Sequence, residues 1–335
     1  MQVGLIIPGD TPPTGGNSIS ARRLQAGLQH EGISSAVELY HKHLTSFDVY
    51  HGWNAHRVGV ALVKDGIDPR RIIVTWTGTD LWQDWVQDFR PIAKGLDQVA
   101  AQVVFTEDAR GRILEDVPGW ADRIHVVPPS VDERVFRPEP ASKSLPHPLV
   151  LIAGGVRPVK RSAWAVDLVE ATRQATGQDI HLAVAGPARH IGEWELVRER
   201  AKTRPWVHLL GEVPKEDMVA WYNSADVTLN TSAVEGVSNA LMEALACGSL
   251  VLCSNIAGNR YLVQDGVNGL LFEDQDEFVA KLSRALEPDD RIRVIREKAR
   301  ACILARHSLI REAQDYVALY QQSLAVAAGP HGCAR

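Results

Sequence analysis

Residues 226–254, DVTLNTSAVEGVSNALMEALACGSLVLCS, contain one complete strand–helix–strand unit. The runs DVTLN and SLVLCS are short and apolar, which predicts two buried strands. The helix between them is expected to begin near Ser238 and to run to Cys247, because Gly248 suits the position that follows a helix. A strand, a crossover helix and a second strand form the repeating unit of a parallel sheet.

The same alternation of strands and helices runs through the rest of the chain. Five further strands are predicted in the first half: VGLII (3–7), FDVYH (47–51), RIIVTW (71–76), QVVFT (102–106) and IHVV (124–127). Three more are predicted after residue 148: LVLIAGG (149–155), DIHLAVAG (179–186) and WVHLLG (206–211). We therefore expect an α/β protein with two doubly wound parallel sheets.

Chain length and proline content suggest where the two domains divide. A chain of 335 residues exceeds what one hydrophobic core usually serves. The proline-rich stretch FRPEPASKSLPHP (136–148) is typical of an interdomain linker. We predict an N-terminal domain over 1–138, a linker over 139–148, a C-terminal domain over 149–305 and a final helix in 306–335 that packs back on the first domain. Two such domains would face a cleft, with ligands beyond the carboxyl ends of the strands.

Bulk composition narrows the class of protein. Apolar residues make up 45% of the chain and charged residues 23%, as in ordinary soluble domains. The net charge of −5 gives no general attraction to nucleic acid, so no nucleic-acid partner is expected. No apolar run reaches the roughly 18 residues of a transmembrane helix, which leaves only peripheral membrane contact open. The sequence predicts no particular oligomeric state.

The cysteines and the N-terminus indicate the compartment. The first residues, MQVGLIIPGD, lack a cationic lead-in and a small-residue cleavage site, so they are interpreted as a strand rather than a signal peptide. The four cysteines have neither metal-site spacing nor the density of a disulfide framework. We therefore expect a reduced, cytoplasmic protein without a metal site. The cysteines are Cys247, Cys253, Cys302 and Cys333.

Two glutamates stand in the apolar stretch 234–248, VEGVSNALMEALACG. Glu235 lies just before the predicted helix, where a carboxylate complements the positive end of the helix dipole. Glu243 lies in the middle of the helix, where burying an unpaired carboxylate is costly. We interpret Glu243 as an acceptor for ligand hydroxyls such as a ribose diol. A structural salt bridge to an arginine or lysine is the alternative.

Backbone and cationic groups at two further strand ends suit an anionic ligand. The N–H groups of Gly236, Val237 and Ser238 would lie at the positive end of the helix, ready for phosphate or sugar oxygens. GGVRPVKR (154–161) follows the first strand of the second domain and places Arg157 and Lys160 after a pair of glycines. Cations aimed into a cleft suit a diphosphate, whereas the alternative is a solvated basic turn.

Polar and glycine residues also follow the strands of the first domain. In PPTGGNSISARR (12–23), Gly15 and Gly16 allow the backbone to approach a ligand, and Asn17 or Ser18 is expected to cap the following helix. A tight turn without a ligand is the alternative. HGWNAH (51–56) and TWTGTDLW (75–82) add four polar candidates, although a lone histidine is more often structural and an aspartate in such a turn can bond only its own backbone. The four candidates are His51, Asn54, Thr77 and Asp80.

These motifs together resemble a known family. The E-x7-E spacing of Glu235 and Glu243, followed by Ala-x-x-x-Gly and a hydrophobic strand, is similar to the signature of the retaining GT-B glycosyltransferases of family 4. The resemblance extends along nearly the whole chain. It includes the N-terminal glycine pair, IHVVPPSVDERVFRP, GGVRPVK, GEVPKEDMVAWYNSADV and DGVNGLLF. It implies a GT-B fold of two Rossmann-like domains, with the N-terminal domain facing the acceptor.

The resemblance also implies roles for individual residues. Glu243 would accept the ribose hydroxyls of the donor nucleotide, and Glu235 would contact the donor sugar. Arg157 and Lys160 would neutralise the diphosphate, so no divalent metal or other cofactor would be required. The remaining implied donor contacts are Gly15, Gly16, Val213, Gly236, Val237 and Ser238. The polar residues at the strand ends of the first domain, which the resemblance places on the acceptor side, remain the acceptor-side candidates: Asn17, His51, Asn54, Thr77 and Asp80.

Three departures from the family pattern stand out. Gly155 occupies the position where the family commonly has an arginine, Thr77 stands where a histidine is frequent, and AGNRYLV (257–263) lacks the usual glutamate. The motifs GGNSISARR, GTDLW, VRPVK and AGN are similar to a short subgroup. That subgroup includes vertebrate glycosyltransferase-domain-containing proteins and, more distantly, selenosugar synthases.

The expected function is therefore transfer of a hexose from a nucleoside-diphosphate sugar, with UDP as the favoured nucleotide, to an unidentified acceptor. The resemblance implies retained anomeric configuration through a front-face path. Three alternatives remain open: a selenosugar-synthase-like transfer to selenophosphate, a non-catalytic nucleotide-sugar-binding protein and an epimerase acting on a UDP-sugar.

Overall fold

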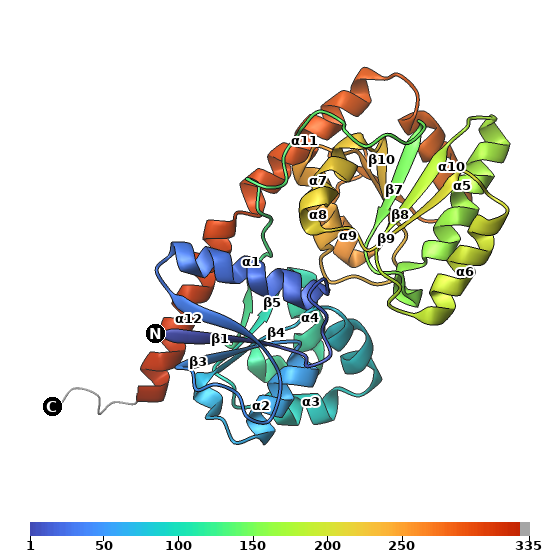
Figure 1. Ribbon diagram of the computed structural model, residues 1–335. Helices are drawn as coiled ribbons and strands as arrows, with labels where there is room; N and C mark the ends of the chain where they lie inside the picture. Colours follow the sequence, from blue (N-terminus) through green and yellow to red (C-terminus); the bar gives the residue numbers. More distant parts are fainter. Residues whose placement is uncertain (329–335) are drawn as a thin grey trace. The chain divides into compact units, whose positions relative to one another are not determined.

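The computed structural model describes residues 1–328 as two compact units (Figure 1). Unit 1 comprises Met1–Ser130 and the chain from His307 onward, and unit 2 comprises Val131–Arg306. The first unit thus ends before the predicted boundary at residue 138, because Val131 and Phe136 are buried in a core cluster of unit 2. Residues 329–335 of the predicted C-terminal segment, including Cys333, lie outside the described residues.

Unit 1 is built on a six-stranded parallel sheet with the order β2-β1-β3-β4-β5-β6. Its strands are β1 (Gln2–Ile7), β2 (Ser34–Leu39), β3 (Val49–Trp53), β4 (Ile72–Thr75), β5 (Ala101–Val104) and β6 (Ile124–Val126). Its α-helices are α1 (Gly16–His30), α2 (Val60–Lys64), α3 (Phe89–Leu96), α4 (Glu107–Asp116) and α12 (Leu309–Ala328). Short helical turns are η1 (Ala55–Gly59), η2 (Pro69–Arg71), η3 (Asp80–Trp85) and η4 (Pro118–Trp120).

Unit 2 is built on a second six-stranded parallel sheet with the order β12-β11-β10-β7-β8-β9. Its strands are β7 (Leu149–Ala153), β8 (His181–Ala185), β9 (Val207–Gly211), β10 (Val227–Asn230), β11 (Val251–Ser254) and β12 (Leu270–Phe272). Its helices are η5 (Pro158–Lys160), α5 (Ser162–Thr176), α6 (Ile191–Lys202), α7 (Lys215–Ser224), α8 (Asn239–Ala246), α9 (Ala257–Leu262), α10 (Gln275–Ala285) and α11 (Asp290–Arg306).

Helices cover both faces of the sheet in unit 2, as predicted for a doubly wound fold (Figure 1). Alternate residues of a strand point to opposite faces. In β7, Val150 and Ile152 therefore pack with α5, α6 and α10, whereas Leu149 and Leu151 pack with α7, α8 and α11. This two-sided burial explains why the strands appear in the sequence as continuous apolar runs rather than as alternating ones.

The proline-rich segment before β7 is fastened to unit 2. The Glu139 N–H donates to Asn223 Oδ1 at 2.8 Å, and the N–H groups of Ser142 and Lys143 donate to Ser224 Oγ at 3.1 and 3.0 Å. These bonds reach the C-terminal end of α7. The segment predicted as a linker therefore lies along unit 2 over at least part of its length.

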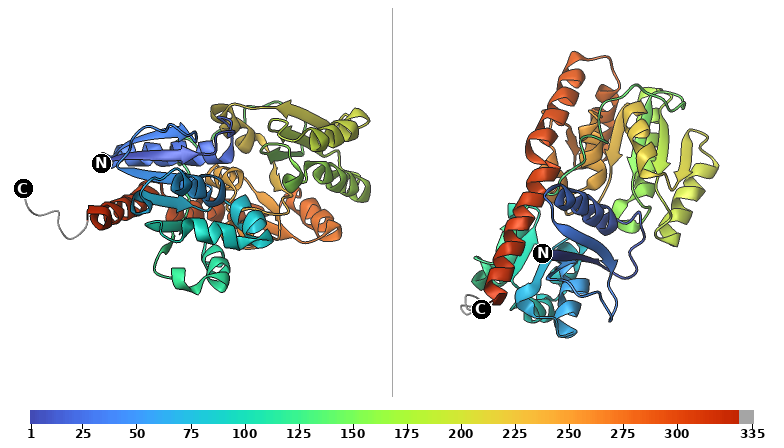
Figure 2. Two further views of the ribbon diagram at one scale, coloured as in Figure 1. Left: turned by 90° about the horizontal axis from the view of Figure 1, so that it is seen from below. Right: turned by 60° about the vertical axis from the view of Figure 1, so that its left-hand side comes forward.

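The final helix α12 packs on α1 and on the sheet of unit 1 (Figure 2). Its Glu312 is buried, accepts a hydrogen bond from the Ser130 N–H at 3.2 Å and lies 3.7 Å from the Arg23 guanidinium of α1. Burial raises the pKa of Glu312, although the Arg23 charge and the Ser130 bonds oppose that rise. Polar contacts as well as apolar packing thus tie α12 to unit 1.

Next to this contact, His51 forms the centre of a buried polar cluster. Its Nδ1 lies 2.7 Å from the Tyr320 hydroxyl and its Nε2 lies 2.7 Å from Thr75 Oγ1. Thr75 Oγ1 also lies 3.0 Å from the Tyr316 hydroxyl, and the His51 ring stacks on Trp53. Because His51 is fully buried, its pKa is lowered to about 3.

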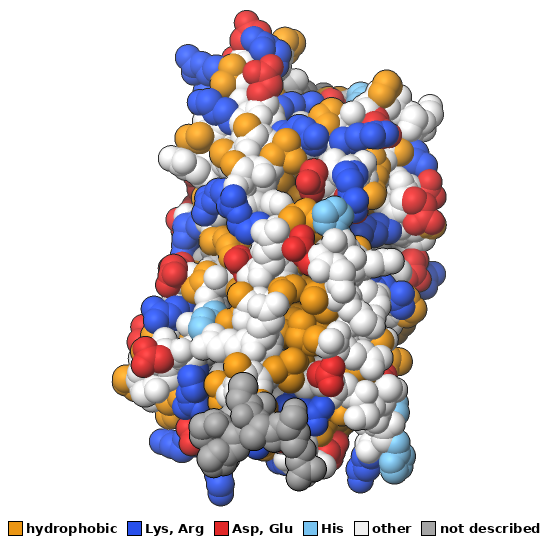
Figure 3. Space-filling model, turned by 90° about the vertical axis from the view of Figure 1, so that its left-hand side faces the viewer, with side chains coloured by type: hydrophobic (Ala, Val, Ile, Leu, Met, Phe, Trp, Pro, Cys, Tyr) orange, Lys and Arg blue, Asp and Glu red, His pale blue; other side chains and the backbone are white. Residues whose placement is uncertain are grey.

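On the face of the molecule drawn in Figure 3, acidic and basic side chains are interspersed. None of the helices within residues 1–328 combines the length and the apolar character that crossing a membrane requires.

The pKa of His51 predicts an acid-sensitive fold. The unfolded chain takes up a proton at His51 near the ordinary pKa of 6.5, but the folded chain does so only near 3. Stability from this residue is therefore complete above 6.5 and decreases as the pH falls. Between pH 7 and pH 5 we expect a loss of about 2 kcal/mol of unfolding free energy. Urea unfolding followed at both pH values measures it.

His51→Gln provides the comparison. The variant keeps polar atoms in the cluster but has no titrating ring, so its unfolding free energy should fall less between pH 7 and pH 5 than that of the wild type. Other groups, such as Asp80 with its raised pKa, affect both proteins equally and cancel in the difference. Equal pH dependence in the two proteins would contradict the assignment.

Candidate functional site

The candidate site of unit 2 lies where the strand order of its sheet reverses. β7 pairs with β10 on one side and with β8 on the other, so successive crossovers leave in opposite directions at this point. In open α/β sheets the space outside the carboxyl ends at such a switch point accepts ligands. The segments that follow β7 and β10 are residues 154–161 and 231–238, and they contain most of the predicted donor residues.

Lys160 and Glu235 meet at this point. Lys160 ends the short helix η5 after β7, Glu235 follows β10, and their ammonium and carboxylate groups form an ion pair. The two side chains are only 15% and 10% exposed. The Thr231 hydroxyl donates to the Lys160 carbonyl oxygen at 2.8 Å, which fixes the backbone of one segment against the other.

Two polar side chains also hold the carboxylate of Glu235. Ser232 Oγ donates to Glu235 Oε1 at 2.7 Å, and Asn230 Nδ2 lies 3.4 Å from the same oxygen. Burial acts to raise the pKa of Glu235, but the charge and hydrogen bond of Lys160, the Ser232 bond and the Arg157 charge together lower it. Glu235 is therefore an ionised carboxylate with several fixed partners, which is more than a helix-end charge requires.

Of the three neighbouring cations, only Lys160 is paired with Glu235. Arg157 is exposed at the start of η5 and acts on Glu235 through its charge. Arg161 donates to the carbonyl oxygens of Thr231 and Ser232 at 2.6 and 3.1 Å, and its guanidinium lies over the Trp164 ring. Arg161 therefore holds the segment after β10, while Arg157 is oriented toward solvent.

Gly258 packs closely against the backbone of Glu235 and Gly236. A Cβ on Gly258 would come within 2.5 Å of the Glu235 carbonyl oxygen and 2.4 Å of the Gly236 carbonyl oxygen, so only glycine fits there. Ser238 is the N-cap of α8, and its Oγ accepts from the Leu241 N–H at 3.5 Å. The helix begins and ends as predicted, with Cys247 as C-cap and Gly248 at a φ of +72°.

Glu243 is 9% exposed in the middle of α8 and accepts a hydrogen bond from the Tyr222 hydroxyl of α7 at 3.0 Å. Burial first, and then the charge of Glu243, raises the pKa of Tyr222, so the phenol stays protonated and donates. Tyr222 was not among the residues predicted from the sequence. Val213, which follows the edge strand β9, packs against the same apolar cluster as Tyr222.

Asn230 is a further residue that was not predicted from the sequence. It is buried at the end of β10, where its Oδ1 accepts from the Ser232 N–H at 3.0 Å, and its Nδ2 faces both Glu235 and Ser238 Oγ. Its sequence signal is a polar residue at the carboxyl end of an apolar strand. Asn230 therefore positions both ends of the segment after β10.

In unit 1, Gly15, Gly16 and Asn17 follow β1, which borders the switch point of its own sheet between β1 and β3. The helix α1 has Gly15 as N-cap without a side-chain hydrogen bond, so the expected capping by Asn17 or Ser18 was wrong. A Cβ on Gly15 would lie 2.8 Å from Thr11 Cγ2, whereas one on Gly16 would meet open space. The turn therefore requires glycine only at position 15.

The other polar candidates of unit 1 have internal partners. Asp80 is fully buried and accepts hydrogen bonds from the N–H groups of Ala55, Thr77 and Gly78 at 2.8 to 2.9 Å, and burial raises its pKa to about 6. Asn54 is buried, has a φ of +80° and accepts from the Arg57 N–H. Asp80 thus ties the ends of β3 and β4 together, and its assignment as an acceptor contact is corrected to a turn-stabilising one.

His51 requires the same correction, because it lies in the core under α12 with both ring nitrogens engaged. A histidine in an apolar strand gives no sequence signal that separates a core position from an exposed strand end. Thr77 is half-buried, and its N–H is bonded to Asp80.

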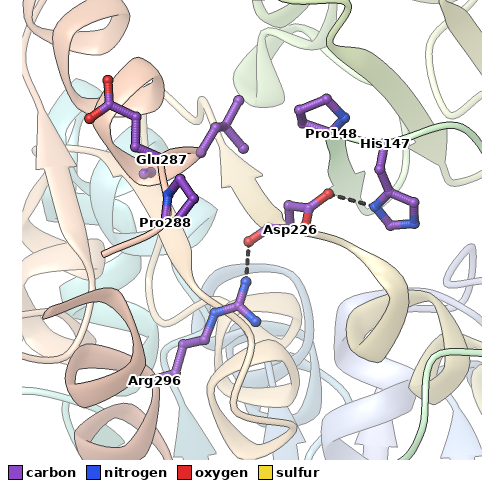
Figure 4. A pocket seen from close by; sticks show the side chains of 8 residues that line it. His147, Pro148, Asp226, Glu287, Pro288 and Arg296 are labelled. Carbon is purple, nitrogen blue, oxygen red and sulfur yellow. Dashed lines mark hydrogen bonds and ion pairs between the residues drawn. The ribbon is translucent and has the colours of Figure 1, made fainter. Parts of the chain in front are cut away.

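A cavity of about 350 Å³ lies at the other end of the sheet of unit 2 (Figure 4). It lies beside the N-terminal ends of β7 and β10, where His147 Nδ1 is 2.7 Å from Asp226 Oδ2 and Arg296 donates to the Asp226 carbonyl oxygen at 2.5 Å. Because parallel strands share one direction, this cavity is separate from the site at the carboxyl ends. Its lining residues are His147, Pro148, Asp226, Ala285, Leu286, Glu287, Pro288 and Arg296. Within residues 1–328, no group of three or more His, Cys, Asp or Glu residues could hold a metal ion.

Comparison with known sequences finds a match for the part of the chain that contains this site. Residues 147–288 match the family model for glycosyl transferases group 1. A D-inositol 3-phosphate glycosyltransferase of Xylanimonas cellulosilytica is 32% identical over 187 residues, covering 50% of this chain and 44% of that enzyme. The chain thus spans about half the length of this relative and of its counterpart from Acidothermus cellulolyticus. Glycosyltransferase 1 domain-containing protein 1 of Xenopus tropicalis is 25% identical over 91% of this chain and 93% of its own length.

Solved structures share the whole fold. HepE of Anabaena, in a complex with UDP-glucose, has a TM-score of 0.78 at 15% identity and covers 96% of this chain and 99% of its own. Sucrose-phosphate synthase of Thermosynechococcus elongatus has a TM-score of 0.77 at 17% identity, covering 97% and 100% of the two chains. The chain has the GT-B fold, and its residues 147–288 match the group 1 glycosyltransferases.

Proposed function

We propose that this protein is a retaining glycosyltransferase that moves a hexose from a nucleoside-diphosphate sugar to an acceptor. The observation that carries the proposal is the ion pair of Lys160 with Glu235 at the switch point of the domain that matches the group 1 glycosyltransferases. A cation that is held beside a fixed carboxylate suits a donor with a diphosphate on one side and sugar hydroxyls on the other.

In this proposal, each group of site residues binds one chemical part of the donor. Lys160 and Arg157 would neutralise the diphosphate, and the backbone N–H groups at the start of α8 would add hydrogen bonds to its oxygens. Glu235 would accept hydrogen bonds from hydroxyls of the transferred sugar. Glu243 would accept hydrogen bonds from the ribose. UDP is the favoured nucleotide because the structural neighbour HepE was solved with UDP and with UDP-glucose.

The transfer in this proposal needs no protein nucleophile. The bond between the anomeric carbon and the diphosphate oxygen breaks, and its electron pair leaves with the diphosphate. The acceptor oxygen bonds to the same face of the sugar, and its proton passes to the departing phosphate. The protein would contribute positioning and charge stabilisation through Lys160 and Arg157, and no divalent metal would take part.

A thermal-shift panel tests the donor class. A ligand that binds only the folded state raises the apparent melting temperature. We expect UDP and UDP-hexoses to raise it more than uridine, because only the former carry the diphosphate. Slow hydrolysis of the donor without acceptor should release the hexose with its original anomeric configuration, which NMR detects. Inversion of that configuration would refute retention, and a panel without any shift would refute the donor class.

Lys160→Ala should reduce hydrolysis of the sugar donor and transfer to the acceptor by roughly 100-fold. A loss of this size is expected when a hydrogen-bonding group that stabilises the transition state is removed. The binding of UDP should weaken as well, measured by isothermal titration calorimetry. Lys298→Ala removes an exposed lysine from α11 of the same unit and should leave both quantities unchanged. Unchanged turnover in Lys160→Ala would show that the diphosphate lies elsewhere.

Glu235→Gln should separate the nucleotide from the sugar. The substitution releases Lys160 from its counter-ion, so UDP should bind as well as before or better. Contacts with the sugar hydroxyls weaken, so the affinity of UDP-glucose relative to UDP should fall. If the ratio of the two dissociation constants stayed constant, Glu235 would not contact the sugar.

Glu243→Gln should weaken UDP binding about tenfold, because hydrogen bonds to a charged acceptor are the stronger ones. The decisive comparison is UDP against dUDP, which lacks the 2′-hydroxyl. The wild type should prefer UDP, and the variant should lose most of that preference. Tyr222→Phe keeps the carboxylate and should keep the preference. A preference for UDP that survived in Glu243→Gln would exclude the ribose contact.

A further inference from the structure

Two long cationic side chains approach the glycine pair that follows β7. A Cβ built on Gly154 would lie 3.8 Å from Cε of Lys160, and one built on Gly155 would lie 2.6 Å from Cγ of Arg189. Lys160 comes from η5 and Arg189 from the segment between β8 and α6. The absence of side chains at Gly154 and Gly155 therefore leaves room for both cations over the same stretch of backbone.

Backbone hydrogen bonds fix the position of Arg189. The Val156 N–H donates to the Pro187 carbonyl oxygen at 2.9 Å, and the N–H groups of Arg189 and His190 both donate to the Val156 carbonyl oxygen at 3.0 Å. This short ladder joins the segment after β8 to the segment after β7. Because the backbone of Arg189 is part of this ladder, the hydrogen bonds fix where its side chain begins. The aliphatic part of the side chain therefore lies over Gly155.

The guanidinium of Arg189 has a counter-ion in the next segment along the sheet. Its Nη2 lies 3.7 Å from Oε1 of Glu212, which follows β9, and the two side chains are 29% and 52% exposed. A pair at this distance and exposure is weak and exchanges readily with water or another anion. Lys160 is likewise paired with a carboxylate, that of Glu235. Both cations thus have carboxylate partners that a stronger anion could replace.

We propose that Arg189 is a binding residue for the diphosphate of the nucleotide, acting together with Lys160 beside Gly154–Gly155. This inference rests on the proposed function, since it assigns a second cation to the same donor. A guanidinium offers a planar fork that binds two phosphate oxygens at once, which an ammonium cannot do. Glu212 is then the counter-ion that the diphosphate displaces from Arg189.

Calorimetric titration of the full chain with UDP and with uridine tests the assignment. Arg189→Ala should weaken UDP binding roughly 10- to 100-fold, the effect of losing charged hydrogen bonds, and should leave uridine binding unchanged. Arg189→Lys should recover part of the loss, because it restores the charge but not the fork. Glu212→Gln should strengthen UDP binding about two- to fivefold, because it removes a weak competing carboxylate.

Arg198→Ala is the matched control, because it removes an exposed arginine from α6, the helix that follows Arg189. It should leave both affinities unchanged. Equal weakening of UDP and uridine in Arg189→Ala would show a purely structural role and overturn the inference, as would an unchanged UDP affinity. If the wild type binds uridine and UDP equally tightly, the proposed function fails. If the wild type prefers UDP but the Arg189 variants bind UDP as tightly as the wild type does, only this inference fails.

Discussion

The parallel pairing of β7 with β10 is the constraint on which the candidate site depends. It brings together two segments far apart in the chain, so that the cation after one strand meets the carboxylate after the other. The pairing itself is fixed by burial on both faces, since a shift of one residue would exchange the sides of every side chain in the strand. The site is therefore a consequence of core packing, and its polar groups are held at the carboxyl ends of two central strands.

Three buried or nearly buried carboxylates show how the fold resolves the cost of burying charge. Asp80 receives backbone N–H groups and has a raised pKa, which suits a turn that needs a fixed acceptor. Glu235 receives a lysine and has a lowered pKa. Glu243 receives a neutral tyrosine hydroxyl. Backbone N–H groups are fixed donors, whereas a lysine and a tyrosine are donors on side chains that can rotate.

The sequence predicted most of the architecture for identifiable physical reasons. Strands buried on both faces are continuous apolar runs, and α8 has its cap at Ser238 and its stop at Gly248 as expected. The two strands that were missed, β2 and β12, both lie at the edges of their sheets. β2 is mostly half-buried and β12 has three residues, so neither produces a long apolar run.

The candidate site was less predictable than the fold, because its residues depend on packing between segments. Lys160 and Glu235 could be named from strand ends, but their ion pair requires the strand order, which no local pattern specifies. His51 was misjudged because a core histidine and an exposed one have the same local sequence, whereas burial separates them.

The arrangement of charges has a consequence for selectivity. Lys160 and Arg189 each have a carboxylate partner, so these two cations are nearly balanced in charge, whereas Arg157 adds a further positive charge beside them. A single negative charge gains little by replacing one of these carboxylates, because it exchanges one pair for a similar one. In the proposed binding mode, a diphosphate replaces both carboxylates at once. Because the exchange would favour a ligand with two linked phosphates, the counter-ions would discriminate against monophosphates.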